Sequence, residues 1–292
     1  MHFFSRLFVS SVLFAVSLLA SGSASAMPLS ARCEDIFQTF LEPVESLKAS
    51  YMAREFSREP DENLNGQVTN RVPVTLESMR MAYARGLYPY GEVQGRDTWF
   101  SSPDRGILDF DKLRIGKSDR AALRKLHEQV AEGKLQITRN QAFAEVVRGC
   151  AAQDRQQRNA QTGELEEGHG TWITESYQNA AIDAFKAGEA YSKEIWRDGK
   201  LVAGVYGFLW NGVFHAESMF HTEKEVAKLA FEEMINDAKA MGYKWLDVQV
   251  APPDSTSLTV KWGAHTISRA EFQHRQVEAR QQMLRLKRQS EL

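Results

Sequence analysis

The clearest pattern of hydrophobic and polar residues lies in the second half of the chain, where three alternating stretches precede a helical repeat. The alternating stretches are residues 192–197, 200–209 and 213–220. Asp198-Gly199 and Asn211-Gly212 separate them, and such pairs favour tight hairpin turns because both turn residues need positive φ. Apolar residues then recur at helical spacing up to Gly242, and residues 244–250 are typical of a strand. This order predicts an α/β sandwich in which the last strand lies beside an earlier one.

Further helices and strands are predicted upstream of this region. Thr75, Asn140 and Thr174 each precede a helical repeat, and their side chains can cap a helix N-terminus. The predicted elements are a helix from residue 76 to Gly86, a strand at 106–110, a helix at 117–132, a strand at 135–138, and helices at 141–149 and 175–187.

Three segments carry little apolar pattern. Residues 55–73 are polar and interrupted by proline and glycine, and residues 153–169 are poor in apolar side chains, so both are predicted to be loops. Residues 273–292 are basic and rich in glutamine, which predicts a helical or disordered tail.

The first 26 residues have the layout of a secretory signal. Arg6 precedes the apolar run Leu7–Ala20, and Ala24-Ser25-Ala26 is typical of a cleavage site. The apolar run is shorter than the ~20 residues of a membrane-spanning helix, so no membrane span is expected after removal of the signal. An exported or periplasmic protein is predicted. Alternatively, translation starts at Met27 and the protein is cytoplasmic.

The net charge of −2 describes an ordinary surface, so any contact with nucleic acid requires a local basic patch. One candidate lies in the predicted helical region between residues 112 and 139, and a solvated helix face is the alternative interpretation. Its basic residues include Arg114, Lys117, Arg120, Arg124 and Lys125.

Cysteine and histidine motifs give no indication of a metal site. The two cysteines, Cys33 and Cys150, can pair if the protein is exported, although a buried thiol is the simpler state of Cys150. The chain contains neither a CxxC nor an HExxH motif, so no metal and no diffusible cofactor is predicted.

Polar residues interrupt the apolar pattern of two predicted strands. Glu217 follows His215-Ala216, and Asp247 and Gln249 lie in the strand LDVQV, where side chains two residues apart share a face. A carboxylate on an apolar strand is costly unless it is paired. These three residues are therefore either a candidate site or an ordinary solvent-facing strip.

The motifs around these residues resemble the leucyl/phenylalanyl-tRNA–protein transferase family, whose core carries G-ESMF and a strand of the form [IL]-D-x-Q-[VM]. The resemblance covers about residues 74–272 and also includes 81–89 (MAYARGLYP), 99–101 (WFS), 143–151 (FAEVVRGCA) and 170–174 (GTWIT). It implies a GNAT-like domain at 105–272, with a mixed sheet flanked by helices, after a small N-terminal domain at 27–104.

The resemblance also implies an activity, namely aminoacyl transfer from aminoacyl-tRNA to a protein or peptide that begins with Arg or Lys, performed by a monomer. Glu217 would bind the positive side chain of the acceptor. Gln249 would contact the attacking amine, with Asp247 polarising it. A neutral amide is too weak a base to take the proton itself.

The remaining implied contacts concern the donor. Phe214, Met219, Leu246 and Val205 would line the pocket for the apolar aminoacyl side chain. Trp172 and Tyr90 would hold the 3′-terminal adenosine, with Tyr90 standing where the family usually has Trp. The basic residues between 112 and 139 would contact the tRNA backbone.

Two alternatives belong to other functional classes. A CoA-dependent acetyltransferase with a GNAT fold needs a Gln/Arg-x-x-Gly loop for pyrophosphate, and no glycine of this chain has Gln or Arg three residues before it. An exported derivative of the family would no longer use tRNA and would act as another amide-forming acyltransferase or as a peptide-binding module. The signal sequence favours this second alternative, whereas Trp172, Asp247, Gln249 and the basic segment 112–139 oppose it.

Overall fold

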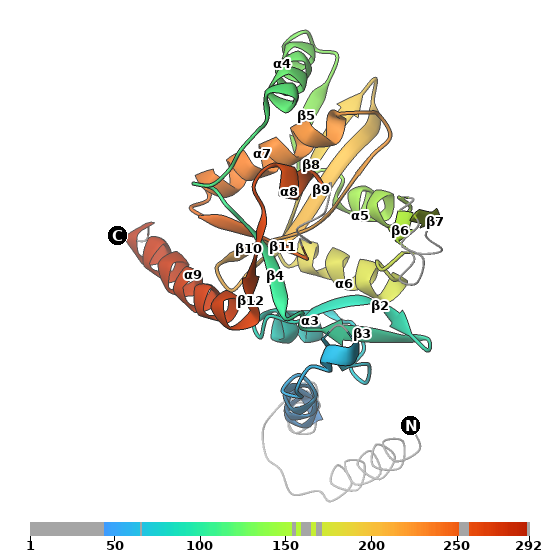
Figure 1. The fold of residues 1–292 in the computed structure, drawn as a ribbon, viewed down its shortest axis with the longest axis vertical. Coiled ribbons are helices and arrows are strands. Elements are labelled where there is room, and N and C mark those ends of the chain that lie inside the picture. The colour runs from blue at the N-terminus through green and yellow to red at the C-terminus, as the bar shows by residue number, and fades with distance from the viewer. Residues whose placement is uncertain are drawn as a thin grey trace, which may run out of the picture. The chain divides into compact units, whose positions relative to one another are not determined.

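The computed structural model describes residues 44–64, 66–153, 156–158, 165–167, 171–250 and 257–290 (Figure 1). Residues 1–54 and 55–292 form two compact units, and the described part of the first, residues 44–54, is helical. The predicted signal segment 1–26, Met27 and Cys33 lie outside the described residues. The predicted domain boundary at 104/105 falls inside the second unit and remains a prediction.

The second unit is built around a seven-stranded mixed sheet. Only one pair of neighbouring strands in it, β10 with β11, is parallel, and the other pairs are antiparallel. This arrangement confirms the predicted α/β fold with its last strand beside an earlier one. Across the sheet the order is β12 (His265–Ser268), β4 (Asp104–Asp109), β11 (Trp245–Gln249), β10 (Val213–His221), β9 (Lys200–Trp210), β8 (Ala190–Arg197) and β5 (Gln136–Arg139).

Helices cover both faces of this sheet (Figure 1). Helix α7 (Val226–Ala240) makes the crossover that a parallel pair of strands requires, and it packs on β8, β9 and β10. Val205 on β9 belongs to the core beneath α7, whereas the adjacent Gly204 meets Val146 of α5 (Phe143–Ala151). Because successive residues of a strand point to opposite faces, α5 covers the face opposite α7. Helix α6 (Glu175–Lys186) packs beside α5.

A smaller three-stranded sheet precedes the large one. It has the order β1 (Gln67–Thr69), β3 (Arg96–Phe100) and β2 (Tyr88–Val93), and α3 (Leu76–Tyr83) follows β1. The prediction of an irregular loop at 55–73 was therefore wrong in part, because η1 (Glu62–Leu64) and β1 form within it. Strand β1 forms because it pairs with β3, which lies about 30 residues later in the chain, and local composition gave no sign of this pairing.

The other elements extend from this framework. The predicted loop at 153–169 contains the short pair β6 (Gln156–Arg158) and β7 (Leu165–Glu167). Helix α4 (Lys117–Ala131) projects at the top of Figure 1, and the short α8 is Leu258–Lys261. The tail is helical and begins earlier than predicted, as α9 (Arg269–Ser290). None of the described helices has the length and apolarity of a membrane span.

Most of the local predictions are confirmed. Both hairpin turns have positive φ at each central residue, and the Thr75 and Thr174 side chains cap α3 and α6. Asn140 was wrongly predicted as a helix cap. Its backbone has φ 58, its side-chain oxygen accepts a hydrogen bond from the Ser192 amide at 2.8 Å, and α5 begins without a side-chain cap.

Glu217 and Gln249 both lie at irregularities of the sheet. On β10, Ala216 pairs with Gly207 and Ser218 with Tyr206, so Glu217 is the extra residue of a β-bulge. On β11, pairing with β4 shifts between Asp247 and Gln249, and Gln249 has φ 61. Bulges redirect a side chain and are frequent beside active sites. Both polar interruptions of the sequence therefore lie where neighbouring strands break register.

We expect Gly207→Ala to lower the free energy of unfolding by about 1–3 kcal/mol, because an added Cβ would lie 2.2 Å from the His215 carbonyl oxygen. Gly116→Ala is the control, since a Cβ there meets nothing within 4 Å, and as the N-cap of α4 it should cost no more than about 1 kcal/mol, the preference of a cap for Gly over Ala. Urea unfolding of both variants measures the difference. Equal stabilities would show that the bulge opposite Gly207 adapts freely.

Candidate active site

Asp247 is the most completely hydrogen-bonded side chain of the site. It is fully buried, and Arg105 reaches it with Nε at 2.8 Å and Nη2 at 2.6 Å. His215 Nδ1 lies 2.7 Å from Oδ2, and the Gln249 backbone amide donates to Oδ1 at 2.9 Å. An ionised carboxylate accepts about four hydrogen bonds, so all of its positions are filled.

These contacts set the ionisation of Asp247. Burial alone would raise the pKa of this carboxyl, but the charge of Arg105 and the hydrogen bonds from His215 and Arg105 outweigh it and hold the pKa well below its ordinary value. Because the carboxylate is an acceptor, His215 Nδ1 carries a proton. Asp247 therefore remains ionised and has no free position from which to accept a proton.

Aromatic rings contact Arg105 and His215, the two side chains that bind Asp247. The Arg105 guanidinium lies over the rings of Tyr88 at 4.4 Å and Phe272 at 4.8 Å, which are favourable cation–π contacts. The His215 ring meets the Tyr83 ring edge-on at 4.9 Å. The buried His215 Nε2 and Arg105 Nη1 have no hydrogen-bond partner among the described residues. The Arg105–Asp247 pair is thus fixed in position on two sides.

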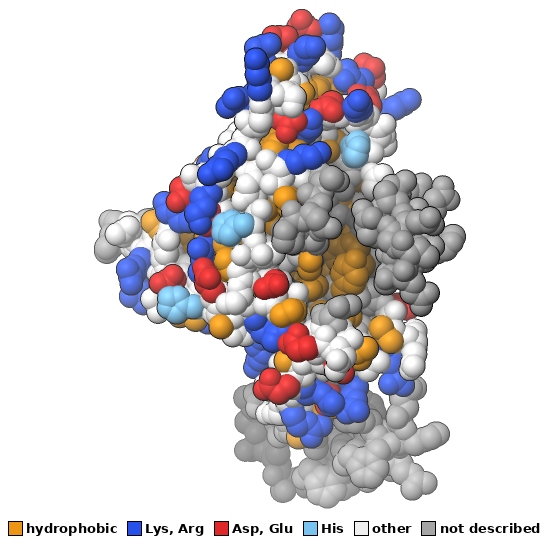
Figure 2. Space-filling model, in the orientation of Figure 1, with side chains coloured by type: hydrophobic (Ala, Val, Ile, Leu, Met, Phe, Trp, Pro, Cys, Tyr) orange, Lys and Arg blue, Asp and Glu red, His pale blue; other side chains and the backbone are white. Residues whose placement is uncertain are grey.

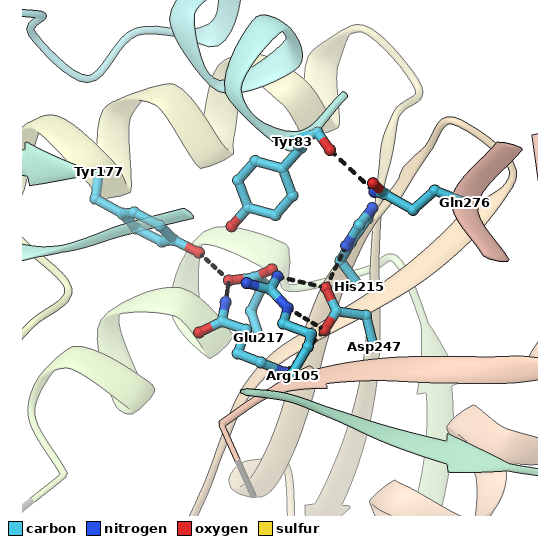
Figure 3. Close-up of polar contacts among 8 residues, drawn as sticks. Tyr83, Arg105, Tyr177, His215, Glu217, Asp247 and Gln276 are labelled. Carbon is cyan, nitrogen blue, oxygen red and sulfur yellow. Dashed lines mark hydrogen bonds and ion pairs between the residues drawn. The ribbon is translucent and has the colours of Figure 1, made fainter. Parts of the chain in front are cut away.

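Glu217 is buried beside this pair and lacks a cation of its own. Its Oε2 accepts hydrogen bonds from the Tyr177 hydroxyl at 2.8 Å and from Gln249 Nε2. The Tyr83 hydroxyl points toward the same carboxyl group (Figure 3). Burial raises the pKa of Glu217 to about 8, and the nearby charge of Asp247 adds to this effect while the Tyr177 hydrogen bond opposes it. At neutral pH the group is therefore mostly protonated, and a bound cation would favour its ionised form.

Tyr90 and Trp172 form an aromatic platform that is linked to Glu217. Their rings stack with centroids 5.6 Å apart and planes inclined by 10°, and the Gly91 amide donates to the Trp172 carbonyl. A base inserted between two rings needs about 7 Å between them, twice the carbon–carbon contact distance. A base must therefore separate these rings or stack on an outer face. Trp172 also meets Tyr177 edge-on at 5.2 Å.

The four apolar residues predicted to line an aminoacyl pocket lie in the core beneath α7. Val205, Phe214 and Leu246 are fully buried there, and Met219 packs at the margin of the same cluster. Phe214 and Leu246 precede His215 and Asp247 in their strands, so they face the opposite side of the sheet. The structure therefore brings the four residues together, with Met219 as the most accessible of them.

The five predicted basic residues are all exposed. Figure 2 shows Lys and Arg side chains mixed with acidic ones at the top of the molecule, where Figure 1 places α4. Arg114 precedes α4, and Lys117, Arg120, Arg124 and Lys125 lie on it. On the same helix, His127 Nε2 lies 2.7 Å from Glu232 of α7, and Glu233 completes a group with metal-ligand spacing. The exposed His127–Glu232 contact connects the two helices, which is sufficient to explain this group.

Four residues of the site were not predicted from the sequence: Arg105, His215, Tyr83 and Tyr177. Tyr83 and Tyr177 belong to the apolar faces of α3 and α6, so their spacing indicated packing and gave no sign of a functional hydroxyl. His215 did offer a signal, because it lies two residues before Glu217 on the same strand. Arg105 offered none, since it is 142 residues from its partner.

We expect Arg105→Met to lower the free energy of unfolding by about 3–5 kcal/mol, because it leaves the Asp247 carboxylate buried without its cation. The control is Arg80→Met, which breaks an exposed pair with Glu189 and should cost about 1 kcal/mol or less. Denaturant unfolding gives both values. A similar cost for the two variants would contradict a special role for the buried pair.

Glu217→Gln should change how stability depends on pH. The folded pKa of about 8 is above the ordinary value of 4.5, so the folded protein holds a proton that the unfolded chain releases. Wild type should therefore lose stability relative to the variant by about 1.4 kcal/mol per pH unit as pH rises between these two values. Unfolding curves at several pH values measure this difference, and a constant difference would mean that Glu217 is ionised in the folded protein.

Comparisons with known proteins agree with these features. A model of the leucyl/phenylalanyl-tRNA protein transferase family matches residues 107–277. A relative named leucyl/phenylalanyl-tRNA–protein transferase from Pseudoalteromonas translucida (strain TAC 125) is 35% identical over 199 residues, covering 68% of this chain and 74% of its own length. A relative with that name from Stutzerimonas stutzeri (strain A1501) is 30% identical and covers 74% of this chain and 84% of its own.

Similarity among solved structures is weaker. The structure of L-PGS from Bacillus licheniformis aligns with a TM-score of 0.33 and 16% identity, over 62% of this chain and 54% of that chain, which is too low to support a conclusion. The family model and the relatives are sufficient by themselves. The chain belongs to the leucyl/phenylalanyl-tRNA–protein transferase family.

Proposed function

We propose that the protein transfers a leucyl, phenylalanyl or methionyl group from aminoacyl-tRNA to the α-amine of proteins that begin with Arg or Lys. In this reaction the amine nitrogen attacks the ester carbonyl carbon and an amide bond forms. The bond between that carbon and the ribose oxygen breaks, and the proton lost by the amine reaches the ribose oxygen through the neighbouring 2′-hydroxyl. Transfer from tRNA to protein matches the names of the relatives.

The observation that carries the proposal is the buried Glu217, which has no cation of its own and hydrogen-bonds to Gln249. The positive side chain of the acceptor supplies the missing cation and becomes the partner that a buried carboxylate needs. Gln249 Nε2 is engaged by Glu217, which leaves its carbonyl oxygen to accept a hydrogen bond from the acceptor amine. The α-amine is thereby held beside the group that binds the side chain.

Asp247 acts as a positioning residue in this proposal. It holds the backbone amide of Gln249 in a left-handed conformation, with φ 61, and its remaining positions are filled by Arg105 and His215. A carboxylate with four donors cannot take the amine proton. The observed contact of Asp247 is with the main chain of Gln249, so it orients that side chain by fixing its backbone.

The donor contacts remain as the sequence implied. The 3′-terminal adenosine stacks on the platform of Tyr90 and Trp172, and the aminoacyl side chain contacts Met219, the accessible member of the core cluster that also holds Val205, Phe214 and Leu246. The five basic residues at α4 neutralise tRNA phosphates. Export directed by residues 1–26 belongs to the proposal as well, with a cytoplasmic protein starting at Met27 as its alternative.

The test uses protein that begins at Met27 and measures transfer of labelled Leu or Phe from charged tRNA to peptides that begin with Arg, Lys or Ala. We expect transfer to the Arg and Lys peptides only, and a fall of about 10- to 100-fold in kcat/KM for Glu217→Gln, because a hydrogen bond to a charged group is lost. Gln249→Ala should lower transfer similarly. Gln282→Ala is the control, since Gln282 bonds the Gly242 carbonyl away from the site.

Absence of both transfer and tRNA binding would contradict the proposed function. A folded protein that neither transfers the label nor binds tRNA would overturn the proposal. It would favour the exported derivative that no longer uses tRNA, which the predicted signal segment at 1–26 supports.

A further inference from the structure

The two oxygens of the Glu217 carboxyl group have different surroundings. Oε2 accepts one hydrogen bond from the Tyr177 hydroxyl and one from Gln249 Nε2. A carboxylate oxygen offers two lone pairs, so these two donors fill Oε2. Oε1 is buried and accepts no hydrogen bond from the described residues, and the Tyr83 hydroxyl, which points toward this carboxyl group, could fill at most one of its two lone pairs. An incoming cation therefore finds one oxygen to bind.

This asymmetry distinguishes the two cationic side chains of the acceptor. The planar guanidinium of arginine binds carboxylates best through two parallel hydrogen bonds, one to each oxygen. The ammonium of lysine is a compact charge whose donors rotate, so one oxygen satisfies it. At Glu217 an arginine would lose half of its preferred contact, whereas a lysine would lose none of its own.

We propose that Tyr177 restricts Glu217 to one available oxygen and thereby makes N-terminal lysine the preferred acceptor over N-terminal arginine. This specificity rests on the proposed function, in which Glu217 binds the acceptor side chain. Tyr177 acts through Glu217 and is a positioning residue.

Tyr177 has little freedom to leave this position. It is 1% exposed, its ring packs edge-on against Trp172 and lies against Phe208, and its backbone amide is held by the Thr174 cap. Burial, together with the charge of Glu217, raises the pKa of Tyr177, so its hydroxyl remains a donor. Gln249, the second donor to Oε2, is fixed through its backbone by Asp247.

The helix that carries Tyr177 is also anchored. Asp97 of β3 accepts hydrogen bonds from the hydroxyls of Thr174 and Ser176 at the start of α6, and from the Val74 amide. An arginine therefore cannot gain the second oxygen by a small displacement of one side chain, because Tyr177 moves only with the first turn of α6.

The experiment measures equilibrium binding to the purified full chain with two peptides that cannot react. One begins with a 6-aminohexanoyl group and the other with a 5-guanidinopentanoyl group, which are lysine and arginine without the α-amine. The ratio of their dissociation constants reports the preference independently of transfer and of moderate losses of stability. The same ratio is measured for kcat/KM with peptides that begin with Lys and Arg.

We expect wild type to favour the ammonium peptide by about 10- to 100-fold, the value of one hydrogen bond to a charged group. Tyr177→Phe keeps the ring and frees a lone pair of Oε2, so the ratio should move toward the guanidinium peptide by a similar factor. Gln249→Met frees the other lone pair and should move the binding ratio in the same direction. This second variant keeps the test decisive if Tyr177→Phe does not fold.

Tyr191→Phe is the matched control, because it also removes a buried tyrosine hydroxyl that bonds a carboxylate, Asp237, at 2.6 Å, away from Glu217. Its ratio should equal that of wild type. A wild-type preference for the guanidinium peptide, no binding of either peptide, or an unchanged ratio in both folded Oε2 variants would overturn the inference. The expected binding ratios without aminoacyl transfer would support the inference and reject the proposed activity instead.

Discussion

The buried ion pair between Arg105 and Asp247 is the interaction on which the rest of the site depends. It joins β4 to β11, and through His215 and the Gln249 amide it ties β10 and the end of β11 to the same carboxylate. A buried pair of this kind is costly to desolvate and rarely stabilises a fold by itself. Its contribution here is geometric. Four donors bind the Asp247 carboxylate, and one of them is the Gln249 amide, so the ion pair fixes the backbone conformation of Gln249.

Irregular strand pairing places two further polar side chains of the site, Glu217 and Gln249, beside this ion pair. A regular β10 would pair Glu217 with β9 and place its side chain by simple alternation, and a regular β11 would do the same for Gln249. The bulge on β10 and the left-handed backbone of Gln249 instead bring the two side chains into contact on one face. The close approach that Gly207 permits between β9 and β10 is part of the same arrangement.

The fold could be predicted well from the sequence because turns, helix caps and hydrophobic periodicity each depend on a few neighbouring residues. The Asp-Gly and Asn-Gly turns, the caps Thr75 and Thr174, and the change from period 2 to helical spacing each act within a few residues. Glu217, Asp247 and Gln249 were visible as polar breaks in apolar strands. Arg105, Tyr83 and Tyr177 were not, because their roles arise from contacts between distant segments, and a tyrosine on an apolar helix face has the same spacing as a core residue. Asn140 was misassigned because a tertiary contact with Ser192 replaced the local cap.

The ionisation of Glu217 has a consequence for the empty protein. Arg105 and Asp247 cancel one another, and a carboxyl group with a pKa of about 8 holds its proton at neutral pH, so these three groups together carry no net charge in the empty protein. In the proposed reaction, an arriving acceptor cation would take the place of that proton, which would leave to solvent. Each such binding event would exchange one positive charge for another, so the net charge of the centre would be the same before and after the acceptor binds.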